Sequence, residues 1–565
     1  MRKASPTVIT HNKIPHPFIV KISVLDSLII LLYFIGIIGL GLWISRRQAK
    51  GGREFFLAGG TMKWPFIGAS LFATNISSQQ FVGQAGLAFA VGIIAGGFQL
   101  VGAFCFILLS AFFIRTYMGL RLATSPEFFE KRYSGRCRVV VSFINLMMII
   151  LGNIAAALYA GALVLTHLLG WDQLPNAEFL YWIAIFLIGI AAGTYTLMGG
   201  LKAVIYCDFV QMVVLVLGGA LLLYFGIMEL GGIESVFVGN VDDAGRSMWS
   251  LLRPWEHAFG WLPMLTGGLI LGVHGHCTDQ DYIQRALSAG SLYHAKMGCL
   301  FAGVLKTLAL LFIAAPGVVA AQLFQGHEIV ARDNAYVSLL TEVMPVGLLG
   351  LCLAGLLAAI MSSVDSGLCA CGSLLTYDFF AKIKKGATDK ELLKDGRIIM
   401  VILLVFCMLI APFIRNFQGL FNYLLAVWAF LAPGVFVTVL FGLFYNRSTE
   451  KAAFSTLCLG VTLGLFSFCL LNIPLLGELK SQLPLFFQNN LNLSPWVTVA
   501  CALNMYLMSN YGYRNAEDES RSEIVAIKGG GLNMSPDETR KYKKFLFGLS
   551  CFIGFTILSF SPFVF

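Results

Sequence analysis

The segment from Phe72 to Gly86 constrains the fold of this chain more than any other stretch. It lies within an apolar run from about residue 66 to residue 90, which as a helix of about 1.5 Å rise per residue is long enough to cross a bilayer. Unpaired polar groups in hydrocarbon cost several kcal/mol each, so the polar groups of this segment should face protein or a water-filled cavity. We therefore expect a helix that is broken at mid-membrane, as in transporters. The alternative is a helix rich in small residues that packs tightly against its neighbours. The polar and glycine residues that crowd its middle are Thr74, Asn75, Ser77, Ser78, Gln79, Gln80, Gly83, Gln84 and Gly86.

The rest of the chain has the composition of a polytopic membrane protein. Of its 565 residues, 58% are hydrophobic and only 12% are charged, and long apolar runs alternate with short polar loops. We predict an all-α protein with about fourteen transmembrane helices in a lipid bilayer, the plasma (inner) membrane. Alternate loops hold most of the 39 Lys and Arg residues, so the positive-inside rule places both termini on the extracytoplasmic side. This asymmetry accounts for the net charge of +9 without a nucleic-acid partner.

A second interrupted segment follows five spans after the first. Residues 259 to 283 contain several glycines around a polar run from His274 to Gln280. Two broken segments in corresponding positions indicate a five-plus-five inverted repeat, with the solute and ion sites where the halves meet. The alternative is coincidence, since the chain has 59 glycines. The predicted division is an extracytoplasmic tail (1–24), an accessory first span with a cytoplasmic loop (25–65), two repeats (66–230 and 259–446) separated by an extracytoplasmic loop (231–258), and accessory C-terminal spans (447–565) with a flexible cytoplasmic loop at 511–543.

The ninth predicted span contains the clearest candidate ligands for a cation. Ala359, Ser362, Ser363 and Ser366 follow one another at positions i, i+3, i+4 and i+7, so they share one helical face. Adjacent hydroxyls and a backbone carbonyl are hard oxygen ligands, which suit an alkali cation and not a soft metal. The alternative for the serines is local helix packing.

Two carboxylates are expected inside the membrane. Asp365 precedes Ser366 on the same span, and Asp208 lies early in the sixth span. A carboxylate in a span is costly and is therefore a candidate functional group by default. Two neighbouring carboxylates would either share a cation or force one of them to keep a proton. The alternative is that Asp365 pairs with the basic loop at residues 382–385.

Lys306 is the only cation well inside a predicted span. It could face a central cavity, or its ammonium group could extend to an interface. Gln99 is the polar residue in the matching span of the first half, and His274 and His276 flank Gly275 in the second interrupted segment. These side chains could also reach a cavity, although a buried histidine is more often bonded to a neighbour.

Several motifs between about residues 25 and 446 resemble the sodium/solute symporter family, and within it the sodium/glucose cotransporter branch. They are NISSQQFVG (75–83), SPEFFEKRY (125–133), YTLMGGLKAVIYCDFVQ (195–211), CTDQDYIQRALSA (277–289), AAIMSSVDS (358–366) and APGVFVTVLFGLF (432–444). The resemblance implies an inverted-repeat transporter fold with sodium-coupled alternating access. Matched by motif, the main sodium site of the family falls on Ala73, Ile76, Ala359, Ser362 and Ser363.

The resemblance also implies a second cation site and a solute site. The second site, found in some members, falls on Asp208, Ser366 and Asp365, where most members have a hydroxyl or a small residue in place of Asp365. Two polar sugar contacts fall on Gln80 and Lys306, and a cavity-side asparagine falls on Asn75.

The solute site departs from the branch at several positions. The acidic sugar contact of the third span falls on Gln99, and its serine neighbour falls on Gly102. The asparagine of the seventh span falls on Gly272, the tyrosine that stacks on the sugar falls on Gly275, and the glutamine of the eleventh span falls on Leu425. These changes predict a roomier cavity for a modified or larger sugar, or for another polar solute.

We predict a sodium-coupled symporter that imports a small polar solute, a sugar or a sugar derivative, with Na+ as the coupling ion. The alternatives are a sodium symporter for an organic acid or a polyol, and a transporter-like sensor that binds solute without moving it. The sequence contains no nucleophile–base pair or cofactor motif that indicates an enzyme. It leaves the oligomeric state open. The candidate solute-binding residues are Asn75, Gln80, Gln99, His274 and Lys306.

Overall fold

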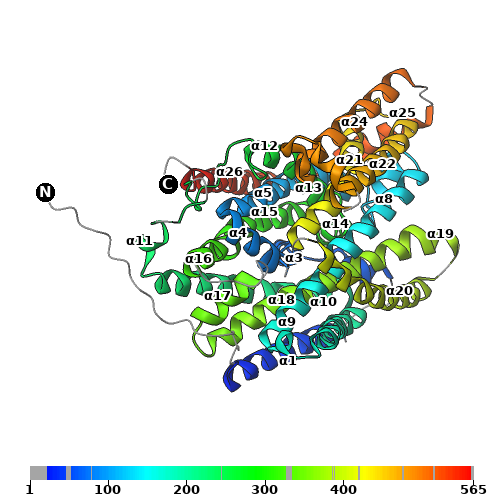
Figure 1. The fold of residues 1–565 in the computed structure, drawn as a ribbon. Coiled ribbons are helices and arrows are strands. Elements are labelled where there is room, and N and C mark those ends of the chain that lie inside the picture. The colour runs from blue at the N-terminus through cyan, green and yellow to red at the C-terminus, as the bar shows by residue number, and fades with distance from the viewer. Residues whose placement is uncertain are drawn as a thin grey trace.

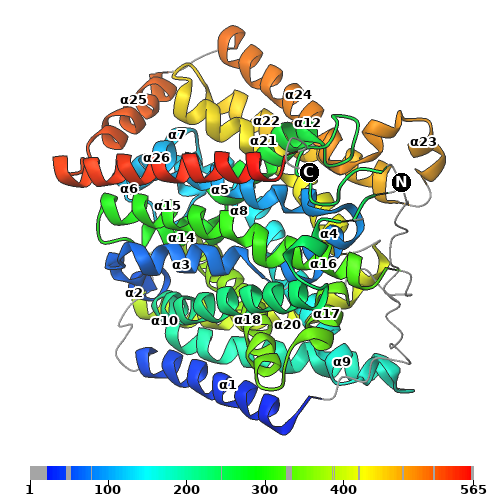
Figure 2. The same ribbon diagram turned by 90° about the vertical axis from the view of Figure 1, so that its left-hand side faces the viewer.

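The computed structural model describes residues 22–45, 52–77, 79–238, 240–242, 245–325, 334–384, 386, 388–417, 420–473, 476–512 and 516–561. Most of the predicted N-terminal tail and Ser78 lie outside these residues. The described part is almost wholly helical and forms a bundle of roughly parallel helices (Figures 1 and 2).

The longer helices run in the following order: α1 (Val24–Ser45), α3 (Trp64–Asn75), α4 (Ala85–Val91), α5 (Gly97–Leu108), α8 (Gly135–Met147), α9 (Ala156–Leu168), α10 (Ala177–Glu229), α13 (Leu269–Cys277), α14 (Gln280–Leu287), α15 (Leu292–Ala309), α16 (Ala315–Leu323), α17 (Ala335–Val343), α18 (Leu348–Leu374), α20 (Asp389–Ile410), α21 (Leu420–Phe444), α22 (Glu450–Asn472), α24 (Asn490–Tyr511), α25 (Ala516–Gly530) and α26 (Pro536–Ser559). Short helices are α2 (Gly52–Leu57), α6 (Ile114–Gly119), α7 (Glu127–Arg132), α11 (Ile233–Val236), α12 (Trp261–Pro263), α19 (Ala381–Ile383) and α23 (Gly477–Ser481). Wider π-helical turns occur at η2 (Gln79–Gln84), η4 (Leu109–Phe113), η5 (Met148–Ala155), η7 (Met264–Gly268), η8 (Leu310–Ala314) and η10 (Leu375–Phe380). Tight 3₁₀ turns occur at η1 (Ala58–Gly60), η3 (Ile93–Gly96), η6 (Trp171–Gln173), η11 (Ala411–Asn416) and η13 (Leu485–Gln488).

Within the described residues, eleven helices are long and apolar enough to span a membrane, against about fourteen expected. Two of the three expected spans that are missing from this set are the interrupted segments, because each is divided into helices too short to count. The third is α24, which is 22 residues long but carries several polar residues and an internal Pro495. The structure therefore supports a polytopic helical membrane protein, and the exact number of spans remains a prediction.

Both predicted helix breaks are confirmed. In the first segment, α3 ends at Asn75 and the π-helical turn η2 leads into α4. In the second, α13 ends at Cys277, and the chain reorients through Thr278 before α14 begins. Asp279 caps α14 through a 3.2 Å hydrogen bond that its Oδ1 accepts from the amide of Asp281. The breaks occur where the sequence places polar side chains able to bond the freed backbone groups.

A glycine joins the fifth and sixth expected spans. These spans appear as one run, α10, in which Gly200 adopts φ 60° and ψ −168° and changes the direction of the chain. A Cβ atom at this position would lie 2.6 Å from the backbone oxygen of Phe55. Only glycine fits both this conformation and this contact.

The helices in the middle of the bundle include those that carry the predicted cation ligands. Helices α3, α14 and α18 lie centrally, whereas α1 and α25 lie toward opposite edges (Figures 1 and 2). Helix α18 is buried along nearly its whole length and packs against α10, and α3 packs against both α10 and α15. The predicted cation and solute residues therefore lie in the protein interior and not on the lipid face.

The predicted loop at 511–543 differs from expectation because part of it is an ordered helix. Helix α25 packs against α6 and α7, and it buries Val525 and Asp518. Asp518 Oδ1 accepts a 2.9 Å hydrogen bond from the amide of Glu450, and Arg115 donates to the backbone oxygen of Leu532 at 3.0 Å. These long-range contacts hold a polar segment whose composition alone suggests flexibility.

Candidate functional site

The break after α3 frees backbone carbonyls in the protein interior. In a continuous helix the amide of Ser77 would bond the carbonyl of Ala73, but it donates to Gln80 Oε1 at 2.9 Å instead. Likewise, the amide of Gln80 donates to the carbonyl of Ser77 at 3.0 Å and not to that of Ile76. Ala73 and Ile76 are both fully buried. Their carbonyl oxygens are therefore the kind of buried backbone acceptors that a cation can use.

The serine pair of α18 faces the same region. Ser362 and Ser363 are buried, with 0% and 2% of their surface exposed. Ser363 Oγ donates back to the carbonyl of Ala359 at 3.0 Å, and Ser362 Oγ donates to Asp208 Oδ1 at 2.6 Å. Because each hydroxyl hydrogen already has an acceptor, the oxygen lone pairs remain for a cation. This donor set of neutral oxygens fits Na+.

Asp208 connects α10 to α3 and α18, the two helices that carry the predicted ligands of the first cation position. Its Oδ1 accepts from Ser362 of α18, and its Oδ2 accepts a 2.5 Å hydrogen bond from Ser70 Oγ of α3. Asp208 is fully buried. A buried carboxylate needs such donors, and these two hold Asp208 against α3 and α18.

Asp365 and Ser366 lie one step farther along α18. Ser366 Oγ donates to Asp365 Oδ1 at 3.2 Å, and it lies 3.3 Å from Thr74 Oγ1. The three residues that the sequence groups as a second cation site are thus brought to one region. Asp208 and Asp365 are linked indirectly, through Ser366 and the guanidinium of Arg285.

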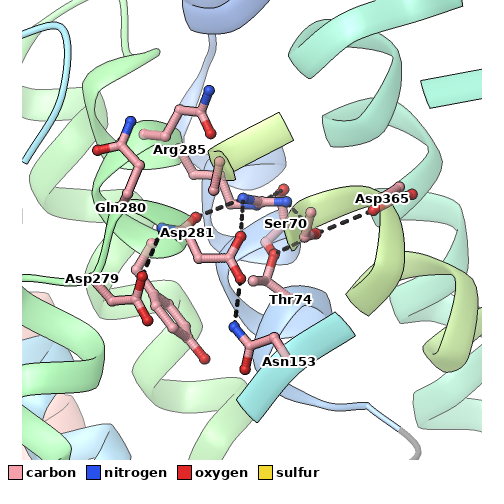
Figure 3. Close-up of polar contacts among 12 residues, drawn as sticks. Ser70, Thr74, Asn153, Asp279, Gln280, Asp281, Arg285 and Asp365 are labelled. Atoms are coloured by element: carbon pink, nitrogen blue, oxygen red, sulfur yellow. Dashed lines mark hydrogen bonds and ion pairs between the residues drawn. The ribbon is translucent and has the colours of Figure 1, made fainter. Parts of the chain in front are cut away.

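Arg285 of α14 lies at the centre of this cluster and is not among the site residues predicted from the sequence. Figure 3 shows its guanidinium between Asp281 on one side and Ser70 on the other. Arg285 Nε donates to Ser70 Oγ at 2.9 Å, Nη2 donates to Ser366 Oγ, and Nη2 lies 3.7 Å from Asp208 Oδ2. Its side chain is fully buried. The signal that could have found it is the pair of opposite charges four residues apart in a motif that follows a helix break.

Asp281 is the second missed residue. Arg285 Nη1 donates to the backbone oxygen of Asp281 at 2.6 Å and lies 3.4 Å from its Oδ1 (Figure 3). The other carboxylate oxygen accepts from Asn153 Nδ2 at 2.8 Å. The polar cluster therefore extends from α10 and α18 to the π-helical turn η5.

A cavity of about 80 Å³ lies between the two interrupted segments. A water molecule needs roughly 10–15 Å³ by the same measure, so the cavity has room for several. Its polar lining consists of Asn75, Gln80, Gln84, Gln99, Asn153, His276, Asp279, Tyr282 and Lys306, and the remaining lining residues are Phe98, Val101, Gly102, Met148, Gly268, Leu271, Gly272, Gly275, Phe421 and Trp428. Four of the five predicted solute-binding residues therefore line this cavity: Asn75, Gln80, Gln99 and Lys306.

Lys306 lies in this cavity and does not extend to an interface. It is 3% exposed, and its Nζ donates to Gln99 Oε1 at 2.6 Å. Gln99 Nε2 in turn donates to Gln84 Oε1, and Gln84 Nε2 donates to the carbonyl of Ala95 at 2.7 Å. The ammonium group keeps further N–H donors that a solute oxygen could accept.

The structure places His276, and not the predicted His274, at the cavity. His274 is fully buried, and its Nδ1 lies 2.8 Å from Thr278 Oγ1. His276 Nδ1 lies 2.8 Å from the carbonyl of Gly272, which can only accept, so Nδ1 carries the hydrogen and Nε2 is an acceptor. The two rings lie on different sides of one helix because residues two apart point about 200° apart.

The glycines that stand where the sodium/glucose cotransporter branch has larger residues also lie in the cavity wall. Gly102, Gly272 and Gly275 line it, whereas Leu425 does not and packs in an apolar cluster with Phe421. A Cβ atom on Gly102 would lie 2.8 Å from Lys306 Cε and 3.1 Å from His276 Nε2. The absence of a side chain at position 102 therefore gives both groups the space they occupy.

Comparisons of sequence and structure identify known proteins that are similar to this chain. The family model described as "Sodium:solute symporter family" matches residues 55–460. The sodium/glucose cotransporter 1 of Sus scrofa is 34% identical over 481 residues, which cover 78% of this chain and 71% of that protein. The sodium/myo-inositol cotransporter 2 of Mus musculus is 34% identical over 474 residues, 78% of this chain and 69% of that protein. Among solved structures, a Na+-coupled sialic acid symporter in a substrate-bound outward-open state superposes with a TM-score of 0.71 at 20% identity, covering 86% of this chain and 98% of that one.

Proposed function

Because this chain belongs to the sodium:solute symporter family, we propose that it imports a small polyhydroxylated solute, a sugar or a sugar derivative, together with Na+ by alternating access. The observation that carries the proposal is the position of the helix breaks. They put buried neutral oxygens of α3 and α18 beside a polar cavity that the second broken segment also lines. The characterised activities named for the relatives are transport activities, so we assign transport and no catalytic role.

The first cation position is proposed at the carbonyls of Ala73, Ile76 and Ala359 and the hydroxyls of Ser362 and Ser363. When Na+ binds here, its gradient across the membrane would drive transport of the solute. The residues would hold it by replacing its water shell with oxygen dipoles, without a full negative charge in direct contact.

A second position, for a cation or a proton, is proposed at Asp208, Asp365 and Ser366. What supports it is a fully buried carboxylate, Asp208, that contacts both helices of the first position. A carboxylate in a membrane interior is retained where a cation or a proton neutralises it.

The proposed solute site is the cavity with Lys306, Gln99, Asn75 and Gln80, to which the geometry adds His276. Solute oxygens would accept from Lys306, and solute hydroxyls would donate to His276 Nε2 and Asn75 Oδ1, neither of which has a hydrogen-bond partner among the described residues. The names of the two mammalian relatives refer to glucose and to myo-inositol, and both are hydroxyl-rich. A single ammonium group that already bonds Gln99 supports an acidic solute less well.

We also propose how the whole chain is arranged in the membrane. We infer fourteen spans, two five-helix inverted repeats at 66–230 and 259–446, and accessory spans on either side. The asymmetry of Lys and Arg between alternate loops supports a plasma-membrane orientation with both termini extracytoplasmic.

The test is solute counterflow in proteoliposomes that contain the purified protein. The panel comprises glucose, galactose, myo-inositol, an amino sugar, a uronic acid and a small organic acid, each with and without a sodium gradient. We expect sodium-stimulated exchange of at least one of the sugars or sugar derivatives in the panel. Exchange of the organic acid alone would favour the alternative symporter. Saturable binding without exchange would favour the sensor.

A further inference from the structure

The guanidinium of Arg285 shares its acceptors with the second proposed cation position. Ser366 Oγ accepts from Nη2, and Ser70 Oγ, which itself bonds Asp208, accepts from Nε at 2.9 Å. A cation at Asp208 and Ser366 would use Ser366 Oγ, which Nη2 now contacts, and Asp208 Oδ2, which lies 3.7 Å from Nη2. It would also lie close to a like charge in a poorly hydrated interior, where the repulsion is weakly screened.

The same guanidinium has a second set of acceptors on its own helix. Asp281 lies one turn before Arg285, and it offers its backbone oxygen at 2.6 Å and its Oδ1 at 3.4 Å. The 3.4 Å distance is longer than a good charge-assisted hydrogen bond, which is about 2.7–2.9 Å. A small shift of the guanidinium toward Asp281 would shorten this contact while it releases Ser366 and Ser70. Figure 3 shows Asp281 and Ser70 on different sides of the Arg285 guanidinium.

Asp281 is also connected to the solute cavity. Its Oδ2 accepts from Asn153 Nδ2 at 2.8 Å, and Asn153 lines the cavity. A continuous series of contacts therefore leads from Asn153 through Asp281 and Arg285 to Ser366, Ser70 and Asp208. These contacts are 2.9 Å or shorter, and all are buried except the partly buried contact of Asn153, so we expect a displacement at one end to change the hydrogen bonds at the other.

We propose that Arg285 is a tethered cation that occupies the second cation position when no ion is bound there, and that Asp281 receives its guanidinium when an ion binds. This inference rests on the proposed cation positions and names the residues that govern the second one. Through Asn153, a solute in the cavity then affects how firmly Asp281 holds Arg285. By linkage, the ion and the solute change each other's affinity by the same factor.

Sodium binding to the purified protein without solute tests the proposal. Isothermal calorimetry, or the sodium-dependent rise in thermal stability, reports binding without any need for transport. We expect Asp281→Asn to raise the half-saturating sodium concentration at least about tenfold, within the range of couplings seen in allosteric proteins, and to lower the Hill coefficient toward one. The neutral amide that replaces the carboxylate holds the guanidinium less well, so Arg285 stays at Asp208 and Ser366 and competes with the ion.

The double variant Asp281→Asn with Arg285→Gln gives the decisive comparison. With the tethered cation removed, the loss of Asp281 no longer matters, so sodium affinity should return to that of the wild type or exceed it. If the carboxylate is only structural, the double variant is as weak as Asp281→Asn or weaker, and the proposal is wrong. Should the double variant not fold, Asp281→Glu serves instead, since it keeps the charge and should retain sodium affinity. A loss there equal to that of Asp281→Asn contradicts the proposal.

A matched control is available on the same helix. Gln284 is buried next to Arg285, and its Nε2 donates to the carbonyl of Phe56 at 2.6 Å, outside the cluster. Gln284→Met should lower stability without changing sodium affinity, and an affinity loss equal to that of Asp281→Asn would overturn the proposal. A wild-type protein that binds no sodium would overturn the proposed function as well, whereas normal sodium binding in Asp281→Asn would overturn this inference alone.

Discussion

Ser362 Oγ donates a 2.6 Å hydrogen bond to Asp208 Oδ1, so a ligand of the first proposed cation position contacts the carboxylate of the second. A cation that binds at Ser362 draws on the same hydroxyl that stabilises Asp208. The hydroxyl hydrogen points to the carboxylate, and this leaves the oxygen lone pairs for the ion. The two positions are therefore not independent, and changes at Asp208 should affect both.

Asp208→Asn should lower sodium affinity more than Asp365→Asn. Asp208 accepts from hydroxyls of two helices and faces Arg285, whereas the hydroxyl contact of Asp365 is to its neighbour Ser366. Removing the charge of Asp208 leaves the buried Arg285 guanidinium with one of its two ion pairs among the described residues, the 3.4 Å contact with Asp281, and a buried charge that loses compensation is costly. Sodium titrations of both variants, with thermal stability measured in parallel, check the order. Equal effects would contradict it.

Lys306→Ala should weaken solute binding about tenfold to a hundredfold and leave sodium binding without solute nearly unchanged. A charge-assisted hydrogen bond contributes about 1.5–3 kcal/mol, and tenfold in affinity corresponds to about 1.4 kcal/mol. The control is Lys296→Ala on the same helix. Its ammonium lies over the ring of Tyr542 at 4.8 Å and does not line the cavity. Wild-type solute affinity in Lys306→Ala, for every solute transported, would remove Lys306 from the site.

Gly102→Ala should raise the half-saturating solute concentration about tenfold. The new methyl would lie 2.8 Å from Lys306 Cε and 3.1 Å from His276 Nε2, so both side chains would have to move, and overpacking typically costs about 1–3 kcal/mol. Gly275→Ala is the comparison, because a Cβ atom there meets no atom within 4 Å. We expect a smaller effect at Gly275 in concentration series of solute uptake. The reverse order would contradict this account of the cavity wall.

Asp378→Asn should destabilise the protein by about 1.5–3 kcal/mol, the contribution of hydrogen bonds to a charged group. Its buried carboxylate pairs with Arg138 Nη2 at 2.5 Å and accepts from Ser142 at 2.5 Å and Thr124 at 2.7 Å. Arg138 would keep its ion pair with the partly exposed Glu130 but would lose its fully buried counter-charge. The control is Asp537→Asn, which breaks an exposed pair with Lys541 and should cost less than about 1 kcal/mol. Unfolding in denaturant should separate the two variants clearly, and similar stabilities would refute the prediction.

Local patterns in the sequence were sufficient for the helix breaks and for the serine face. Polar residues in an apolar run have only a few ways to be satisfied, and the spacing of Ser362 and Ser363 fixes their common face. The same reasoning chose His274, whereas the cavity is lined by His276, because the rotation of that helix depends on its packing. Nor could it place Arg285, although its spacing from Asp281 was visible. Which helix faces Asp208 is decided by long-range packing of α14 against α3, and no local pattern encodes that.

The number of spans shows a second limit. A hydropathy count registers a broken segment as one span, whereas the structure divides it into short helices joined by turns. The linker that contains α25 was misjudged for a related reason. Glu450 contacts the helix at Asp518, and Arg115 contacts the residue Leu532 that follows it, and both partners are far away in the sequence.

The central claim is that Ser362 and Ser363, with the carbonyls freed at the break of α3, hold the Na+ that drives transport. Sodium-dependent uptake by the variant Ser362→Ala/Ser363→Ala, reconstituted beside the wild type, tests it most directly. Each lost oxygen ligand should cost more than the roughly 1 kcal/mol of an ordinary hydrogen bond, because the ion has already given up its water. We predict that the double variant inserts and folds, binds solute weakly, and shows no stimulation of uptake by sodium. A folded double variant with wild-type sodium dependence would contradict the account.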